Sequence, residues 1–282
     1  MKDQFEFYLS KIKLFLKNIL YSFYSTRSSE MKNIISINRK FLNSIDEFVN
    51  EEIYTKNNYG ISPNIFQNIN KPINNSITYS DLINFLILKI FNKNVNYFET
   101  GVSVMKNILQ VDNFIKKSTL YAYEIEEINK IFSSKFQSDI DNFHISKGSN
   151  NFYYFHGDIG SKVDNKRFNH LIGNLKFDFV FSDAHHQPWS LIWEYKNVIK
   201  NNLAEEFIIY FDDIDFPGIE DVVIDILNDL NNGSKKIFGV SFYVNGWIGQ
   251  YEKFHKNAII STFDIKKILN DEKIKIPFIE NL

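Results

Sequence analysis

The sequence of 282 residues contains no cysteine. This absence excludes disulfides, thiolate zinc sites, iron–sulfur clusters and cysteine nucleophiles, so any metal must be held by oxygen or imidazole ligands. Arginine is also scarce, since only Arg27, Arg39 and Arg167 occur among 32 basic residues, and the formal net charge is −2. Because arginine makes most bidentate contacts with phosphates and bases, this composition argues against a nucleic-acid partner.

Long uninterrupted hydrophobic runs are missing as well. Near the N-terminus, Lys11, Lys13 and Lys17 interrupt the roughly 20 apolar residues that a membrane-spanning helix needs, and no small-residue cleavage site follows. We therefore expect no signal peptide, no integral membrane segment and a cytoplasmic protein. Apolar residues from Phe5 to Phe23 recur at helical spacing, which predicts an amphipathic helix. Its acidic and amide residues favour packing on protein over lying on a membrane surface.

The N-terminal quarter is predicted to be helical. A second helical pattern runs from Met31 to Ile53, and residues 56–76 are rich in Asn, Pro and Gly, which is typical of a loop or linker. Ser80 is the expected cap of a third helix over residues 81–91. We interpret residues 1–75 as a helical extension that serves as a lid or as the contact of a homodimer, and residues 76–282 as the main domain.

Short aromatic and β-branched runs alternate with amphipathic stretches in the main domain, which predicts a parallel sheet covered by helices on both faces. Strands are expected at 95–99, 119–124, 152–157, 177–182 and 206–211, with helices at 103–116, 126–137, 165–173 and 188–200. Two further apolar runs, at 236–244 and 247–254, flank Asn245-Gly246, a strong signal for a hairpin with a two-residue turn. The expected fold class is α/β, with a Rossmann-like, mostly parallel seven-stranded sheet that ends in an antiparallel hairpin.

Each of the five alternating strands ends in an acidic residue or is followed closely by one. These acidic residues are Glu99, Glu124, Asp158, Asp183 and the pair Asp212-Asp213. Ligands bind beyond the carboxyl ends of the strands in an open parallel sheet, so this pattern predicts a binding site there. Glu124 stands 23 residues after Gly101, where an acidic side chain accepts hydrogen bonds from ribose hydroxyls, and Asp158 could accept one from an adenine amino group.

Several of these segments resemble the motifs of class I S-adenosylmethionine-dependent methyltransferases. The segments are YFETGVS at 97–103, YAYEIE around Glu124, FHGD at 155–158, FDFVFSDAHH at 177–186 and FIIYFDDID at 207–215. The likeness covers about residues 80–260. Its pattern is most similar to the metal-assisted small-molecule O-methyltransferases, such as catechol O-methyltransferase. The resemblance implies S-adenosylmethionine as cofactor, Mg²⁺ as a second cofactor and a small-molecule acceptor.

The resemblance also implies a role for each matching residue. In the cofactor site, Glu99 and Gly101 would lie under the methionine part, Ser103 would allow close backbone approach, Glu124 would hold the ribose, Asp158 would face the adenine, and Asp183 would border the cofactor. Asp183, Asp212 and Asp213 would hold one Mg²⁺ ion. His186 would be the catalytic base, with His185 as the competing candidate. Trp189 and Trp193 are candidates for stacking on a substrate.

Chemistry gives the acidic trio independent support. Asp183 and Asp212 are 29 residues apart, which suits a strand–helix–strand crossover that brings adjacent strand ends together. Three neighbouring carboxylates repel one another, and a cation would both neutralise them and lower the pKa of a bound substrate hydroxyl. An alternative interpretation is that these carboxylates merely cap helices.

The first motif departs from the family pattern and keeps other functions open. It reads Gly101-Val-Ser103-Val-Met105, where the family usually has two or three glycines. A non-catalytic binding or scaffold protein on a degenerate methyltransferase fold is therefore one alternative. A nucleotide-sugar-dependent glycosyltransferase that uses Asp213-Ile-Asp215 is another. NAD-linked oxidation is disfavoured because a complete G-x-G-x-x-G is missing.

Overall fold

A computed structural model describes residues 26–45, 76–103, 105–128, 137–139, 142–147, 149–233, 235–246 and 255–282. The helix predicted from Phe5 to Phe23, the linker and most of the helix predicted over residues 126–137 lie outside these ranges. None of the helices described is long and apolar enough to cross a membrane.

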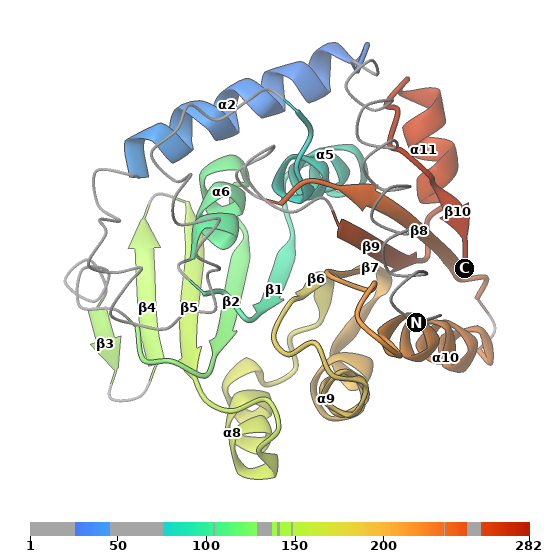
Figure 1. The fold of residues 1–282 in the computed structure, drawn as a ribbon. Helices are drawn as coiled ribbons and strands as arrows, with labels where there is room; N and C mark the ends of the chain where they lie inside the picture. The colour runs from blue at the N-terminus through green and yellow to red at the C-terminus, as the bar shows by residue number, and fades with distance from the viewer. Residues whose placement is uncertain are drawn as a thin grey trace, which may run out of the picture.

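Helices and strands alternate through the described part of the main domain (Figure 1). The helices are α2 (Ser29–Ile45), α5 (Tyr79–Phe91), α6 (Lys106–Phe114), α8 (Lys162–Ile172), α9 (Pro188–Glu194), α10 (Ile219–Asn231) and α11 (Ile265–Asp271), and α9 continues into a π-helical turn (Tyr195–Ile199) and a 3-10 turn (Lys200–Asn202). The strands are β1 (Asn96–Thr100), β2 (Thr119–Glu124), β3 (Gln137–Asp139), β4 (Asn142–Lys147), β5 (Asn150–His156), β6 (Phe177–Ser182), β7 (Leu203–Phe211), β8 (Phe238–Val244), β9 (His255–Ser261) and β10 (Glu280–Asn281).

The strands described form one sheet in the order β10-β8-β9-β7-β6-β1-β2-β5-β4-β3. Its central five strands, β5-β2-β1-β6-β7, are parallel, and β9 runs antiparallel to both of its neighbours, β7 and β8. The chain builds outward from β1 to β5 on one side and from β6 to β7 on the other. This reversal creates a topological switch point between β1 and β6, where ligands bind in open α/β sheets.

The predicted fold class is confirmed. Six of the seven expected strands are β1, β2, β5, β6, β7 and β8. The seventh was expected over residues 247–254, which lie outside the described ranges, and the strand that pairs with β8 is β9. The sequence did not reveal the antiparallel pair β3–β4, which extends the sheet beyond β5, or the two-residue strand β10 beside β8. These edge additions leave the central parallel strands and their switch point unchanged.

Each face of the sheet is covered by its own set of helices. The helices α2, α5, α6 and α11 lie on one face, whereas α8, α9 and α10 lie on the other (Figure 1). Successive strand side chains point to opposite faces, so Tyr97 joins the first core and Phe98 the second. Phe98 stacks on Phe177 with ring centroids 4.7 Å apart. The strands are thus buried on both faces, which explains their continuous aromatic and β-branched composition.

Two local predictions were wrong. Thr78, rather than Ser80, caps α5: its side chain accepts from the Asp81 N–H, and the Asp81 side chain accepts from the Thr78 N–H. The hairpin is also longer than Asn245-Gly246 indicated. Val244 pairs with His255, so ten residues separate the two strands instead of two. Asn245 makes a different contact, because its carbonyl accepts from the Tyr79 N–H.

A buried ion pair fastens α2 to α5. The Arg39 guanidinium donates to both oxygens of Asp81, at 3.1 and 2.6 Å, and also to the Ser76 carbonyl. Asn38 donates to the same carboxylate at 2.8 Å. Met31, Ile34 and other apolar residues of α2 enter the first core. The described helix of the N-terminal extension is therefore packed into the main domain.

Replacing Arg39 with Met should destabilise the protein by about 3–5 kcal/mol, because the Asp81 carboxylate would stay buried without its charge partner. Adding Asp81→Asn should restore part of this loss, since the amide carries no charge and still caps α5. Urea unfolding of the two variants measures both effects. A loss below about 1 kcal/mol for Arg39→Met would contradict a tightly coupled pair.

Candidate functional site

Two loops touch backbone to backbone at the switch point. Gly101, which follows β1, has φ +71°, and a Cβ added to it would lie 2.2 Å from the carbonyl oxygen of Asp183. The sequence placed this glycine under a ligand. The structure places it against the turn that follows β6, so its missing side chain serves loop packing and thereby fixes the position of Asp183.

The first motif keeps the backbone shape of a glycine loop with only one glycine. Ser103 and Met105 both have positive φ, at 48° and 63°. This left-handed region costs non-glycine residues roughly 1–2 kcal/mol each. Such strain persists where the surrounding structure imposes it, and it concentrates at binding sites. Met105 is buried, and the helix α6 begins directly after it.

Glu124 connects this loop to the end of β2. One of its oxygens accepts from the Ser103 N–H at 2.8 Å, and the other accepts from the N–H groups of Ile125 and Glu126 at 2.8 and 3.4 Å. Burial raises the pKa of its carboxyl, and the three N–H donors oppose that rise. A carboxylate offers about four acceptor positions, so one remains for a ligand hydroxyl.

Glu99 is held within the protein. It is 1% exposed and accepts from the Tyr97 hydroxyl at 2.6 Å and from the Asn107 amide at 2.7 Å. Burial raises the pKa of its carboxyl to about 8, against the opposing effect of both donors. Glu99 therefore lies beneath the switch point as a largely protonated side chain near neutral pH.

Two large apolar side chains on the loops at this end of the sheet are exposed. Ile125, next to Glu124, is 61% exposed, and Trp189 at the start of α9 is 60% exposed. The Trp189 indole lies near Gly160, 3.6 Å from where a Cβ on that residue would be. Asp158 is exposed beside it and accepts from the Gly160 N–H at 2.7 Å. Trp193, one turn further along, is only partly exposed.

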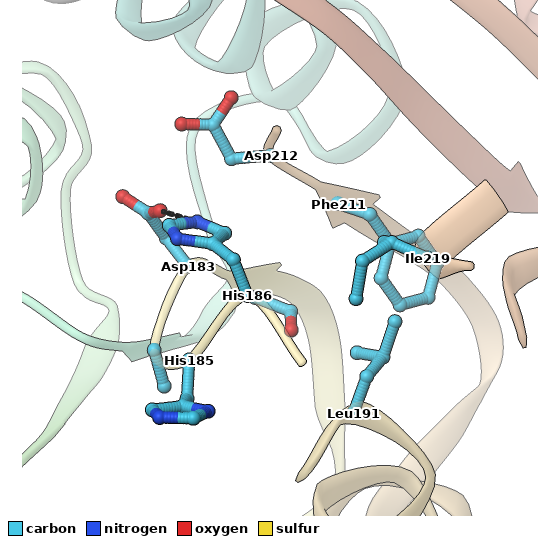
Figure 2. Close-up of a pocket in the computed structure, with 9 residues that line it drawn as sticks. Asp183, His185, His186, Leu191, Phe211, Asp212 and Ile219 are labelled. Carbon is cyan, nitrogen blue, oxygen red and sulfur yellow. Dashed lines mark hydrogen bonds and ion pairs between the residues drawn. The ribbon is translucent and has the colours of Figure 1, made fainter. Parts of the chain in front are cut away.

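Asp183 and Asp212 line a narrow pocket between the ends of β6 and β7 (Figure 2). His186 lies between two carboxylates: its Nε2 atom is 3.2 Å from Asp183 Oδ1 and 3.8 Å from Asp213 Oδ2. The His186 ring also stacks on Phe216, with centroids 5.0 Å apart. His185 lies apart from the carboxylates in Figure 2, and its ring is near Trp189. The geometry thus separates the two histidines that compete for the role of base.

A third histidine joins the acidic cluster. Ligand atoms of Asp212, Asp213 and His255 all lie within 4.8 Å of one another. His255 Nδ1 contacts Asp213 Oδ1, and Nε2 is 3.6 Å from Asp212 Oδ1. Asp183 is not part of this group of three, although it interacts with both aspartates through charge.

Sequence reasoning missed His255 because it searched only the carboxyl ends of strands. β9 is antiparallel to β7, so its first residue lies at the same sheet edge as the last residues of the parallel strands. The predicted hairpin carried this signal, but its second strand was expected to begin too early. A search of both strand ends in the hairpin would have found His255.

Burial, and after it the crowding of carboxylates, determines the electrostatics of this edge. Burial, and then the charges of Asp212 and Asp213, raise the pKa of the Asp183 carboxyl well above its ordinary value. Burial also raises the pKa of Asp212, while His255 opposes that rise. A positive charge placed among these side chains would therefore be strongly stabilised.

Glu194 is connected to Asp183 through the Thr100 hydroxyl. Its carboxyl accepts from the Thr100 hydroxyl at 2.8 Å, and the same Thr100 oxygen accepts from the Asp183 N–H at 3.4 Å. Burial raises the pKa of Glu194 to about 7. No sequence pattern indicated this side chain, because acidic residues within helices are ordinarily exposed.

The fold is similar to those of solved methyltransferase structures. One, described as an O-methyltransferase from Klebsiella pneumoniae, is 11% identical with a TM-score of 0.41, and the match covers 87% of this chain and 95% of that one. Another, described as a caffeoyl-CoA O-methyltransferase from Staphylococcus aureus, is 15% identical with a TM-score of 0.43 and coverages of 79% and 98%. The MycE methyltransferase of mycinamycin biosynthesis, solved with Mg and SAH, is 13% identical with a TM-score of 0.36 and coverages of 68% and 54%.

These likenesses concern the fold alone. No protein-family model matches the chain, and no curated protein matches its sequence. The chemistry must therefore be inferred from the residues of this chain.

Gly101→Ala should destabilise the protein by at least about 2 kcal/mol more than Gly173→Ala. Both glycines have positive φ, but an added Cβ at Gly173, whose ψ is −121°, meets nothing within 4 Å, so that control carries only a conformational cost of about 1–3 kcal/mol. Urea unfolding measures the difference. Equal losses would mean that the contact with Asp183 contributes nothing beyond backbone conformation.

Glu99→Gln should change how stability depends on pH. The folded protein retains a proton on Glu99 that the unfolded chain loses, so unfolding releases a proton between about pH 4.5 and 8. The free energy of unfolding of the wild type should therefore fall, relative to Glu99→Gln, by up to about 1.4 kcal/mol per pH unit as pH rises through this window. Denaturant titrations at several pH values test this. Exposed Glu126→Gln is the control, and parallel curves for Glu99→Gln would contradict the assignment.

Proposed function

We propose that this protein is an S-adenosylmethionine-dependent methyltransferase that O-methylates a small-molecule or sugar hydroxyl with the help of a divalent cation. The observation that carries the proposal is the contact between the Ser103 N–H and the Glu124 carboxylate. It joins a strained, glycine-like loop after β1 to the acidic residue after β2. These are the two elements that hold a nucleoside at the switch point of an open α/β sheet.

The surroundings of Glu124 suit an adenosyl group. Its remaining acceptor position can take a ribose hydroxyl. Ile125, the next residue, and Trp189, which lies near Gly160, are exposed apolar side chains of the kind that pack against a purine ring. Asp158 offers an acceptor oxygen for the adenine amino group from the end of β5. When bound, S-adenosylmethionine supplies the reactive methyl group.

The acidic edge next to this surface would receive the acceptor. Asp183, Asp212 and Asp213 fit a hard divalent cation because they bring three carboxylates to adjacent strand ends. When bound, the cation lowers the pKa of a coordinated hydroxyl. His186 lies between Asp183 and Asp213, where its imidazole can accept the hydroxyl proton as the methyl group is transferred. The protein otherwise contributes alignment of the two reactants.

The arrangement of Asp213 favours this function over nucleotide-sugar transfer. Asp213 contacts His255 and lies near His186, whereas Asp215 is exposed and stands outside the group formed by Asp212, Asp213 and His255. The Asp213-Ile214-Asp215 spacing therefore does not bring both aspartates to one candidate cation site.

S-adenosylhomocysteine should raise the melting temperature of the wild type, while UDP-sugars and NAD should not. Glu124→Ala should abolish this shift, because it removes the ribose acceptor and the anchor of the Ser103 loop. Glu126→Ala, an exposed neighbour whose side chain has no place in the proposed site, is the matched control and should retain the shift. Thermal unfolding with each ligand measures these effects.

Two outcomes would contradict the proposal. If no nucleoside ligand shifts the melting temperature, the fold serves as a non-catalytic scaffold. If the S-adenosylhomocysteine shift survives unchanged in Glu124→Ala, the cofactor lies elsewhere. A circular dichroism spectrum of Glu124→Ala that matches the wild type ensures that a lost shift reports binding.

A further inference from the structure

We propose that His255 is a ligand of the divalent cation together with Asp212 and Asp213, and that the site consequently prefers Mn²⁺ and similar transition ions to Mg²⁺. This inference rests on the cation of the proposed function and adds both a ligand and an ion preference to it. It starts from the observation that the acidic cluster also contains an imidazole, that of His255.

The position of His255 is fixed by the sheet. It begins β9, pairs with Val244 of β8 and is only 4% exposed. Because β9 is antiparallel to β7, His255 lies beside the two aspartates that follow β7. Its candidate ligand atoms and theirs lie within 4.8 Å of one another, a spacing that allows all three side chains to share one ion.

Buried neighbours orient the cluster. The Asn257 amide donates to Asp212 Oδ1, and the Tyr210 hydroxyl donates to Asn257 Oδ1 at 2.6 Å. All three residues are on or next to the paired strands β7 and β9 and are buried. Asp213 has φ +48°, a strained conformation that places it beside His255. Such supporting hydrogen bonds and local strain are typical of side chains held ready for a metal.

The chemistry of the ligands determines the preferred ion. Mg²⁺ favours oxygen ligands and retains much of its water, whereas imidazole nitrogen binds first-row transition ions well. A ligand set that includes the His255 imidazole beside the carboxylates accordingly favours a transition ion. Mn²⁺ is the useful probe because it accepts both ligand types and is paramagnetic.

The experiment uses full-length protein, Mn²⁺ and Mg²⁺ without acceptor. Calorimetry should show Mn²⁺ bound at least about tenfold more tightly than Mg²⁺, and His255→Gln should reduce that ratio by about tenfold. Pulsed electron paramagnetic resonance of the Mn²⁺ complex should show coupling to an imidazole nitrogen, which His255→Gln abolishes. The matched control is the double variant His185→Gln/His186→Gln, which should retain the coupling although it lacks both neighbouring loop histidines.

Histidine labelled with ¹⁵N tests the proposal even if His255→Gln fails to fold. In the double variant, a ¹⁵N coupling to Mn²⁺ would support His255 as the ligand without altering it. Loss of the coupling in the double variant would overturn the proposal and assign the imidazole to a loop histidine. Absence of any imidazole coupling, or equal affinities for Mn²⁺ and Mg²⁺, would also overturn it.

The same samples distinguish this inference from the proposed function. S-adenosylhomocysteine binding is titrated separately by calorimetry. Binding of that ligand without imidazole coupling overturns the role of His255 and leaves the methyltransferase proposal intact. Imidazole coupling without S-adenosylhomocysteine binding supports His255 as a metal ligand and contradicts the methyltransferase proposal.

Discussion

The candidate site depends on how several carboxylates are kept together at one buried edge of a sheet. Desolvation and mutual repulsion both act against this arrangement, and each side chain is compensated differently. Glu99 retains its proton, Glu124 accepts three backbone N–H groups, and Asp213 contacts His255. Asp183 faces His186 but keeps a strongly raised pKa. Asp183 and Asp212 thus keep raised pKa values, and a cation bound beside Asp212 would stabilise both carboxylates.

The glycine-poor first motif forms its loop with residues other than glycine at two left-handed positions. Ser103 and Met105 adopt the left-handed conformations that glycine takes without cost. The Ser103 N–H donates to Glu124, and burial of Met105 anchors the start of α6. Contacts with the surrounding residues, and not glycine content, therefore maintain the left-handed conformations of this loop.

The sequence predicted the central sheet well because its strands are short, apolar on both faces and separated by amphipathic helices. The predictions made from it were wrong where contacts with other residues determine the local structure. Thr78 caps α5 because Asp81 completes the reciprocal capping box, and the connection after Asn245 is long although Asn-Gly favours a tight turn. The acidic residues of the site were predicted from strand ends. His255 and Glu194 were not, since their roles depend on an antiparallel pairing and on a helix packed against the sheet.

The central claim is that the Glu124 loop holds an adenosyl cofactor next to the acidic edge. A crystal structure of the protein grown with S-adenosylhomocysteine tests it most directly. The account predicts ribose density within hydrogen-bond distance of Glu124, adenine between Ile125 and Trp189, and the sulfur atom directed toward Asp183 and His186. Density for the ligand at any other place, or no density at saturating concentration, would contradict it.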